Sequence, residues 1–76
     1  MKRFYKVNDS MFIEIGFIKS IDRWYADLID IEVHERIATN YNTDKIKLIA
    51  DIVRDTWFSS DDMVNFSFFI EDILKY

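Results

Sequence analysis

The chain has 76 residues, of which half are hydrophobic and 17% aromatic, a formal net charge of −4 and no cysteine. This length corresponds to one domain spanning residues 1–76, and the hydrophobic content is far above that of a disordered segment. The absence of cysteine excludes a disulfide framework and a thiolate metal site. No apolar run of about 18 residues occurs, and the N-terminal segment turns polar at Asn8 and Asp9, so we expect a soluble cytoplasmic protein.

The charge is unevenly distributed along the chain. Residues 1–6 carry three basic side chains, whereas residues 7–35 carry seven acids against two bases. A protein that binds nucleic acid through phosphates needs a larger basic patch than three N-terminal charges. Direct nucleic-acid binding and membrane binding are therefore not expected. The acidic surface suits a basic protein partner, although acidity also simply keeps a small protein in solution.

Hydrophobic alternation predicts three antiparallel strands in the first half, at about 2–7, 11–20 and 24–34. The clearest run is Leu28–His34, in which β-branched residues alternate with Asp30, Glu32 and His34. Within the second strand, Gly16 predicts a bulge, a bend or a close backbone approach. The third strand is expected to present an inner and an outer row of side chains. The predicted inner row is Tyr25, Asp27, Ile29, Ile31 and Val33, and the outer row is Trp24, Ala26, Leu28, Asp30, Glu32 and His34.

Residues 11–29 also allow a helical interpretation. Phe12, Ile15, Ile18, Tyr25 and Leu28 fall at helical spacings apart from one gap, and Asp9 or Ser10 could cap such a helix. An all-α small bundle is therefore the alternative to the α+β fold. Isoleucine and aromatic enrichment favours the strands.

Two helices are predicted in the second half, at about 43–57 and 60–75, and they would pack across one face of the sheet. Residues 40–43 are interpreted as a loop that ends in good N-cap residues. In the first helix, apolar residues sweep a wide arc that would contact both the sheet and the last helix. In the second, Ser59 and Asp62 have the spacing of a capping box.

Two features indicate a protein-binding surface. Val64 and Phe68 fall off the predicted apolar face of the last helix, toward the side that carries Asp61 and Asp72, as in a docking patch rimmed by charge. Two alternatives are open. The helical phase could be shifted by one residue, which would bury Val64 and Phe68, or the two side chains could form the contact of a homodimer. The second feature is the acidic row, and its predicted partner-binding residues are Asp27, Asp30, Glu32 and Glu35.

Catalytic signatures are absent from the sequence. With one histidine, one glycine and no cysteine, the chain lacks P-loop, dinucleotide, thiol and triad motifs. His34 is flanked by acids, and we expect it to be a solvent-exposed surface residue. The spaced acids do not form a calcium-loop pattern, so no metal or cofactor is expected. The aromatic residues are expected in the core, because the basic groove that a base-stacking surface requires is missing.

These features together predict a small acidic non-catalytic protein that binds and inhibits a basic partner, one that itself binds nucleic acid. Its carboxylates would occupy lysine and arginine sites meant for phosphates. In general character the chain is similar to small inhibitors made by phages and mobile elements, including anti-CRISPR proteins, although no motif identifies such a family. One alternative is an immunity protein or antitoxin that neutralises a nuclease toxin. Another is a small homo-oligomeric structural subunit, a homodimer for example.

Overall fold

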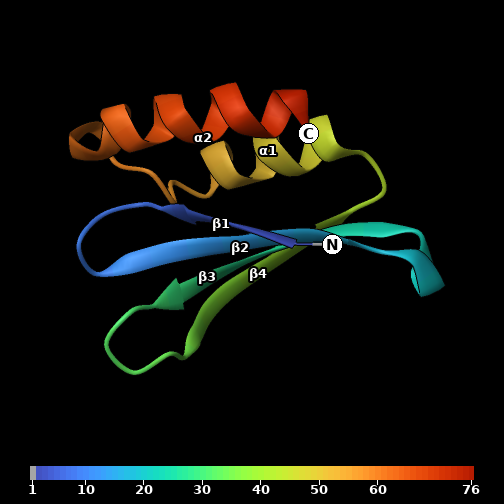
Figure 1. The fold of residues 1–76 in the computed structure, drawn as a ribbon, viewed down its shortest axis with the longest axis horizontal. Coiled ribbons are helices and arrows are strands. Elements are labelled where there is room, and N and C mark those ends of the chain that lie inside the picture. The colour runs from blue at the N-terminus through green and yellow to red at the C-terminus, as the bar shows by residue number, and fades with distance from the viewer. Residues whose placement is uncertain (1) are drawn as a thin grey trace.

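A computed structural model describes residues 2–76 as a four-stranded antiparallel sheet with two helices across one face (Figure 1). The strands follow one another in the order β1-β2-β3-β4. Their bounds are Lys2–Lys6 for β1, Met11–Ile18 for β2, Arg23–Asp30 for β3 and Arg36–Asn42 for β4. A short 3-10 turn, η1 (Lys19–Ile21), connects β2 to β3. The helices are α1 (Lys45–Arg54) and α2 (Met63–Lys75), and α2 is preceded by the 3-10 turn η2 (Ser60–Asp62). The α+β class is confirmed, and the all-α alternative is wrong.

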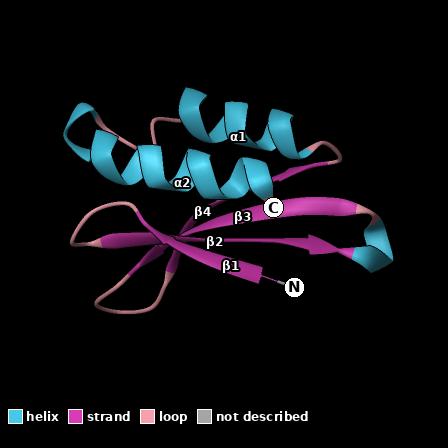
Figure 2. Cartoon of the chain, turned by 45° about the horizontal axis from the view of Figure 1, so that its top comes forward, coloured by secondary structure: helices cyan, strands magenta, loops and turns pink. Residues whose placement is uncertain are grey.

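The two faces of the sheet differ in what covers them. Strand register places Ile13, Ile15, Ala26 and Leu28 on one face, where they are buried beneath the helices. Tyr25, Asp27 and Ile29 lie on the opposite face, which no helix covers (Figure 2). The predicted sidedness of the third strand was therefore wrong, because its outer row is the buried one.

The third strand is also shorter than predicted. It ends at Asp30, and residues 31–33 form a turn in which the His34 amide donates to the Asp30 carbonyl at 2.9 Å. His34 then adopts a left-handed conformation with φ of 56°. The predicted strand over 24–34 was thus wrong beyond Asp30, because the alternating pattern of isoleucine, valine and acids continues through a turn.

The predicted count of three strands was wrong, because a fourth strand, β4, runs over Arg36–Asn42 and includes residues 40–42, which were interpreted as part of a loop. Strand β4 is an edge strand whose helix-facing side is polar at Asn40 and Asn42. The side-chain amide of Asn40 donates to the Asp55 carboxylate at 3.0 Å, and the side-chain amide of Asn42 donates to the Asp51 carboxylate at 3.4 Å. These bonds attach α1 to β4 through polar groups, which hydrophobic patterning cannot detect.

Each helix begins and ends for a local reason. The Asp44 carboxylate accepts the Ile46 amide at 2.8 Å and caps α1, and the left-handed Thr56 ends the helix soon after Arg54. Helix α1 is therefore shorter than the predicted 43–57. At the second helix the capping box is confirmed, since Asp62 accepts the Ser59 amide at 2.9 Å and Ser59 caps η2 in return.

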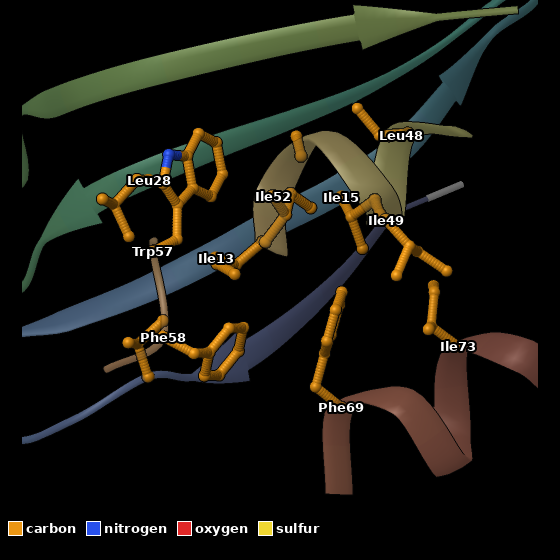
Figure 3. Close-up of a cluster of buried hydrophobic side chains, with 12 residues drawn as sticks. Ile13, Ile15, Leu28, Leu48, Ile49, Ile52, Trp57, Phe58, Phe69 and Ile73 are labelled. Atoms are coloured by element: carbon orange, nitrogen blue, oxygen red, sulfur yellow. The ribbon is translucent and has the colours of Figure 1, made fainter. Parts of the chain in front are cut away.

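The core lies between the sheet and the helices (Figure 3). Phe69 of α2 contacts Tyr5 edge-on at 5.1 Å between ring centroids and stacks on Phe58 at 5.3 Å. The link between the helices contributes Trp57 and Phe58, which are both buried. The largest fully buried side chains are Val7, Ile13, Ile15, Leu48, Ile52, Phe69 and Ile73.

Two smaller expectations have clear outcomes. Gly16 pairs in register with Lys2 and Tyr25, with no bulge in β2. The register irregularity lies instead between Leu28 and Ile29, where β3 pairs with β4. Within residues 2–76, no helix combines the length and apolar character that crossing a bilayer requires.

Candidate functional site

The predicted acidic row does not form a row. Asp27 lies on the helix-free face of the sheet, where its carboxylate accepts the Thr39 hydroxyl at 2.5 Å and lies 3.9 Å from Arg36. Asp30 is the last residue of β3, and Glu32 and Glu35 follow in the β3–β4 loop. The structure therefore separates Asp27 from the other three acids.

Asp30 organises the β3–β4 loop. Its carboxylate accepts the Glu32 amide at 2.9 Å and the Val33 amide at 3.2 Å. This is an Asx-type turn, in which a short carboxylate side chain replaces a backbone acceptor. The Ile31 amide donates to the Ser10 carbonyl at 2.9 Å, which ties the loop to the β1–β2 turn. The loop thus presents Glu32 and Glu35 on an ordered backbone, and Asp30 has a structural role.

The β3–β4 loop belongs to an acidic end of the molecule, which we define as residues 7–10, 30–36 and 59–62. The β1–β2 turn connects the other two segments of this end. Its Ser10 carbonyl accepts the Ile31 amide of the β3–β4 loop, and its Val7 carbonyl accepts the side-chain amide of Asn65 in α2 at 2.9 Å. Figure 1 shows the β1–β2 turn, the β3–β4 loop and the start of α2 at the same end of the sheet. This end contains one arginine, Arg36, and six carboxylates: Asp9, Asp30, Glu32, Glu35, Asp61 and Asp62.

Four of these carboxylates, Asp9, Glu32, Glu35 and Asp61, are exposed. Sequence analysis placed Glu32, Glu35 and Asp61 among the candidate residues but omitted Asp9. In a strand meander the first and third connections lie at the same end, so the omitted residue could have been found from topology alone.

The outer side of α2 carries the predicted apolar pair. Val64 and Phe68 are 71% and 65% exposed, and their spacing of four residues places them side by side on the helix. Their predicted projection away from the core is confirmed. A shallow pocket of about 280 Å³ beside Phe68 is lined further by Glu71, Asp72 and Lys75. Asp61 belongs to the acidic end, Val64 follows it at the start of α2, and Phe68 lies one turn further along the helix.

Asp72 has internal partners that the sequence did not reveal. It lies 3.1 Å from the Arg3 guanidinium of β1 and also accepts the Tyr5 hydroxyl. The bond from Tyr5, together with the charge of Arg3, lowers the pKa of Asp72. Burial and the bond to Asp72 raise the pKa of Tyr5 to about 12. Asp72 therefore anchors α2 to β1.

The opposite end of the molecule is basic. We define the basic end as residues 2–3, 19–23, 43–47 and 75–76, which contain seven lysines and arginines against Asp22 and Asp44. The placement of α1 and α2 agrees with this grouping, because Lys45 lies over the Trp24 ring at 5.6 Å and Arg3 lies over the Tyr76 ring at 4.1 Å. The protein is thus polarised along the strands. Of the seven bases at this end, the charge pattern of the sequence had singled out only Lys2 and Arg3, because Lys6, the third N-terminal base, pairs with Asp9 at the other end of β1.

Residues 2–76 contain no group of three or more histidine, cysteine or acidic side chains arranged to hold a metal ion. His34 lies exposed in the β3–β4 loop. No protein-family model, curated protein or solved structure matches the chain. The two charged ends and the outer side of α2 are therefore the surfaces that bear on function.

Proposed function

We propose that this chain is a non-catalytic binding protein that docks its acidic end and the outer side of α2 onto a basic surface of another protein. The observation that carries the proposal is the concentration of carboxylates at one end of the fold. Glu32 and Glu35 have no salt-bridge partner among the described residues, in contrast to Asp72 with Arg3. Carboxylates without internal partners are available to pair with an external cation.

Proteins that handle nucleic acid display the basic surfaces that such an end would fit. Their lysine and arginine side chains pair with phosphate oxygens, and a carboxylate supplies oxygens of the same charge. The Asx turn at Asp30 fixes the backbone that carries Glu32, which lowers the ordering cost of binding. A stoichiometric inhibitor of phage or mobile-element type, such as an anti-CRISPR protein, would act in this way.

The exposed apolar pair supplies the second part of the proposed interface. Exposed Val64 and Phe68, with Asp61 one turn before them, resemble an apolar centre with a charged rim. Charged rim residues chiefly determine association rate and specificity, whereas desolvated aromatic residues contribute most of the affinity. The two parts therefore predict different effects on binding.

The test is capture of a partner from lysate at about 50 mM salt, repeated near 500 mM, where exposed charges are strongly screened. The loop variant combines Glu32→Gln with Glu35→Gln. Its matched control combines Glu14→Gln with Asp22→Asn, which removes the same charge away from the acidic end. We expect the loop variant to lose capture several-fold at low salt and the control to retain it. Equal capture by both double variants would contradict the role of the acidic end.

The apolar pair is tested separately with Phe68→Ser. We expect this variant to release the partner faster at every salt concentration, since the lost contact is apolar. The genes next to this one distinguish an inhibitor from an immunity protein, because an adjacent nuclease-toxin gene would favour the immunity protein.

A further inference from the structure

The basic end contains an aromatic pocket that the proposed function does not use. It has a volume of about 310 Å³ and is lined by Phe17, Lys19, Trp24 and Tyr76. Trp24 packs edge-on against Phe17 at 5.4 Å and against Tyr76 at 5.9 Å. Figure 2 shows that the β2–β3 hairpin, which carries Phe17 and Trp24, extends beyond the ends of both helices. An apolar side chain entering it would contact three rings.

The charges around the pocket select what can enter. Lys19 is part of the wall, Lys45 lies over the Trp24 ring, and Arg3 lies over the Tyr76 ring. Such a rim attracts an apolar side chain that is flanked by carboxylates and repels one that is flanked by bases.

The other end of the same molecule presents this combination. Val33 at the tip of the β3–β4 loop is 60% exposed and Ile31 is 37% exposed, and Glu32 and Glu35 accompany them. The two amide bonds to Asp30 hold the loop in shape before any contact forms. A preformed loop loses little conformational entropy on docking.

We propose that the protein associates with itself head to tail, with Val33 of one copy seated in the Phe17, Trp24 and Tyr76 pocket of the next. In this arrangement the loop glutamates face Lys19 and Lys45 of the receiving copy. The two ends are complementary in charge, because the acidic end has six carboxylates against Arg36 and the adjoining Lys6, which pairs with Asp9 at 3.0 Å, and the basic end has seven bases against two acids.

A head-to-tail contact has a definite consequence for assembly. Because the loop and the pocket lie at opposite ends, each copy that donates its loop keeps its own pocket open. Such an interface is heterologous, so copies add to form short chains or a ring in place of a closed symmetric dimer. The contact is small and charged, and the association should therefore weaken as salt is added.

This inference does not depend on the proposed function, because purified protein suffices to test it. The two would be related in the cell, since a basic partner that binds Glu32 and Glu35 would displace the neighbouring copy. Failure of lysate capture leaves self-association standing, and failure of self-association leaves lysate capture standing.

The test is sedimentation velocity at rising protein concentration, up to about 1 mM, in low and in high salt. The wild-type protein should sediment progressively faster with concentration in low salt and as a monomer in high salt. Val33→Ser removes the inserted side chain, and Lys19→Glu reverses a charge on the pocket wall. Each variant alone should be monomeric, with dissociation constants raised about tenfold or more.

Mixing the two variants gives the sharpest result. The Val33→Ser protein keeps a native pocket, and the Lys19→Glu protein keeps a native loop, so one native interface can form between them. The mixture should therefore stop at a heterodimer, whereas the wild-type protein continues to larger species. Both changes are at exposed positions, and circular dichroism checks that the variants remain folded.

The control variants are Val64→Ser, which makes the same change outside the loop tip, and Lys6→Glu, which reverses a lysine that lies outside the pocket and pairs with Asp9 at 3.0 Å. Both controls should still associate. A monomeric wild-type protein across the whole range would overturn the proposal. Association that survives Val33→Ser and Lys19→Glu but is lost in Val64→Ser would overturn it too, and would place the contact on α2.

Discussion

Two adjacent phenylalanines of α2 should lose very different amounts of stability on the same substitution. Phe69 is fully buried against Tyr5 and Phe58, whereas Phe68 is 65% exposed on the outer side of the helix. Truncating a buried phenylalanine costs about 3 to 5 kcal/mol, because transfer energy is lost and a cavity is left. Truncating an exposed one changes stability by about 0.5 kcal/mol or less. Phe69→Ala should therefore be severely destabilised and Phe68→Ala nearly unchanged.

The size of the chain makes this difference easy to measure. At roughly 0.05 to 0.15 kcal/mol per residue, the whole chain has about 4 to 11 kcal/mol of stability. Phe69→Ala thus removes a large share of the total. Urea unfolding followed by tryptophan fluorescence, to which Trp24 and the buried Trp57 both contribute, gives both free energies of unfolding with the same probe. Equal losses in the two variants, or a larger loss in Phe68→Ala, would refute the helical phase that exposes the proposed docking pair.

Four further predictions concern charge, capping and the order of the β3–β4 loop. The pKa of Asp72 is lower in the folded protein than in the unfolded chain, where it is about 3.9. The stability that Asp72 contributes is therefore complete above that unfolded pKa and is lost as the pH falls through the lower folded pKa. The raised pKa of Tyr5 means that its contribution is complete below about pH 10 and is lost as the pH rises toward 12, so Tyr5→Phe should flatten the alkaline part of a pH-unfolding curve. Ser59→Ala should cost about 1 kcal/mol by urea unfolding and Ser60→Ala much less, and comparable losses would argue against the capping box. Asp30→Ala should accelerate hydrogen exchange at the Glu32 and Val33 amides, which donate to the Asp30 carboxylate. Unchanged exchange at both would show that the Asx turn does not order the loop.

The third strand shows why hydrophobic alternation alone does not determine where a strand ends or which of its faces is buried. Both rows of β3 contain apolar side chains, so Tyr25 and Ile29 compete with Trp24 and Leu28 for the buried side. Counting Ile31 and Val33 as strand residues decided that competition wrongly, because both lie in the turn. The missed signal was Asp30, whose short carboxylate can bond the amides of the following residues and end a strand.

The fourth strand could not be predicted from hydrophobicity. Its helix-facing positions include Asn40 and Asn42, whose side-chain amides donate to Asp55, the residue after α1, and to Asp51 on α1. Those partners are brought together by the tertiary fold. The α2 helix was easier, because the Ser59 and Asp62 spacing and the apolar periodicity gave the same result. That agreement is why the exposure of Val64 and Phe68 was predicted correctly.

The candidate site was predictable by composition but not by arrangement. The acids at Glu32, Glu35 and Asp61 were identified, yet their common location depends on the meander topology and on the β1–β2 turn that joins them. The partners of Asp72 come from β1, at the far end of the sequence. Contacts between distant segments of this kind require the fold.

The most direct test of the binding proposal is hydrogen exchange of the protein alone and in complex with a captured partner. The account predicts slower exchange on binding at residues 31–35 and 60–68, which cover the β3–β4 loop and the start of α2. Protection confined to the strands of the helix-free face, with both of those segments unchanged, would contradict it.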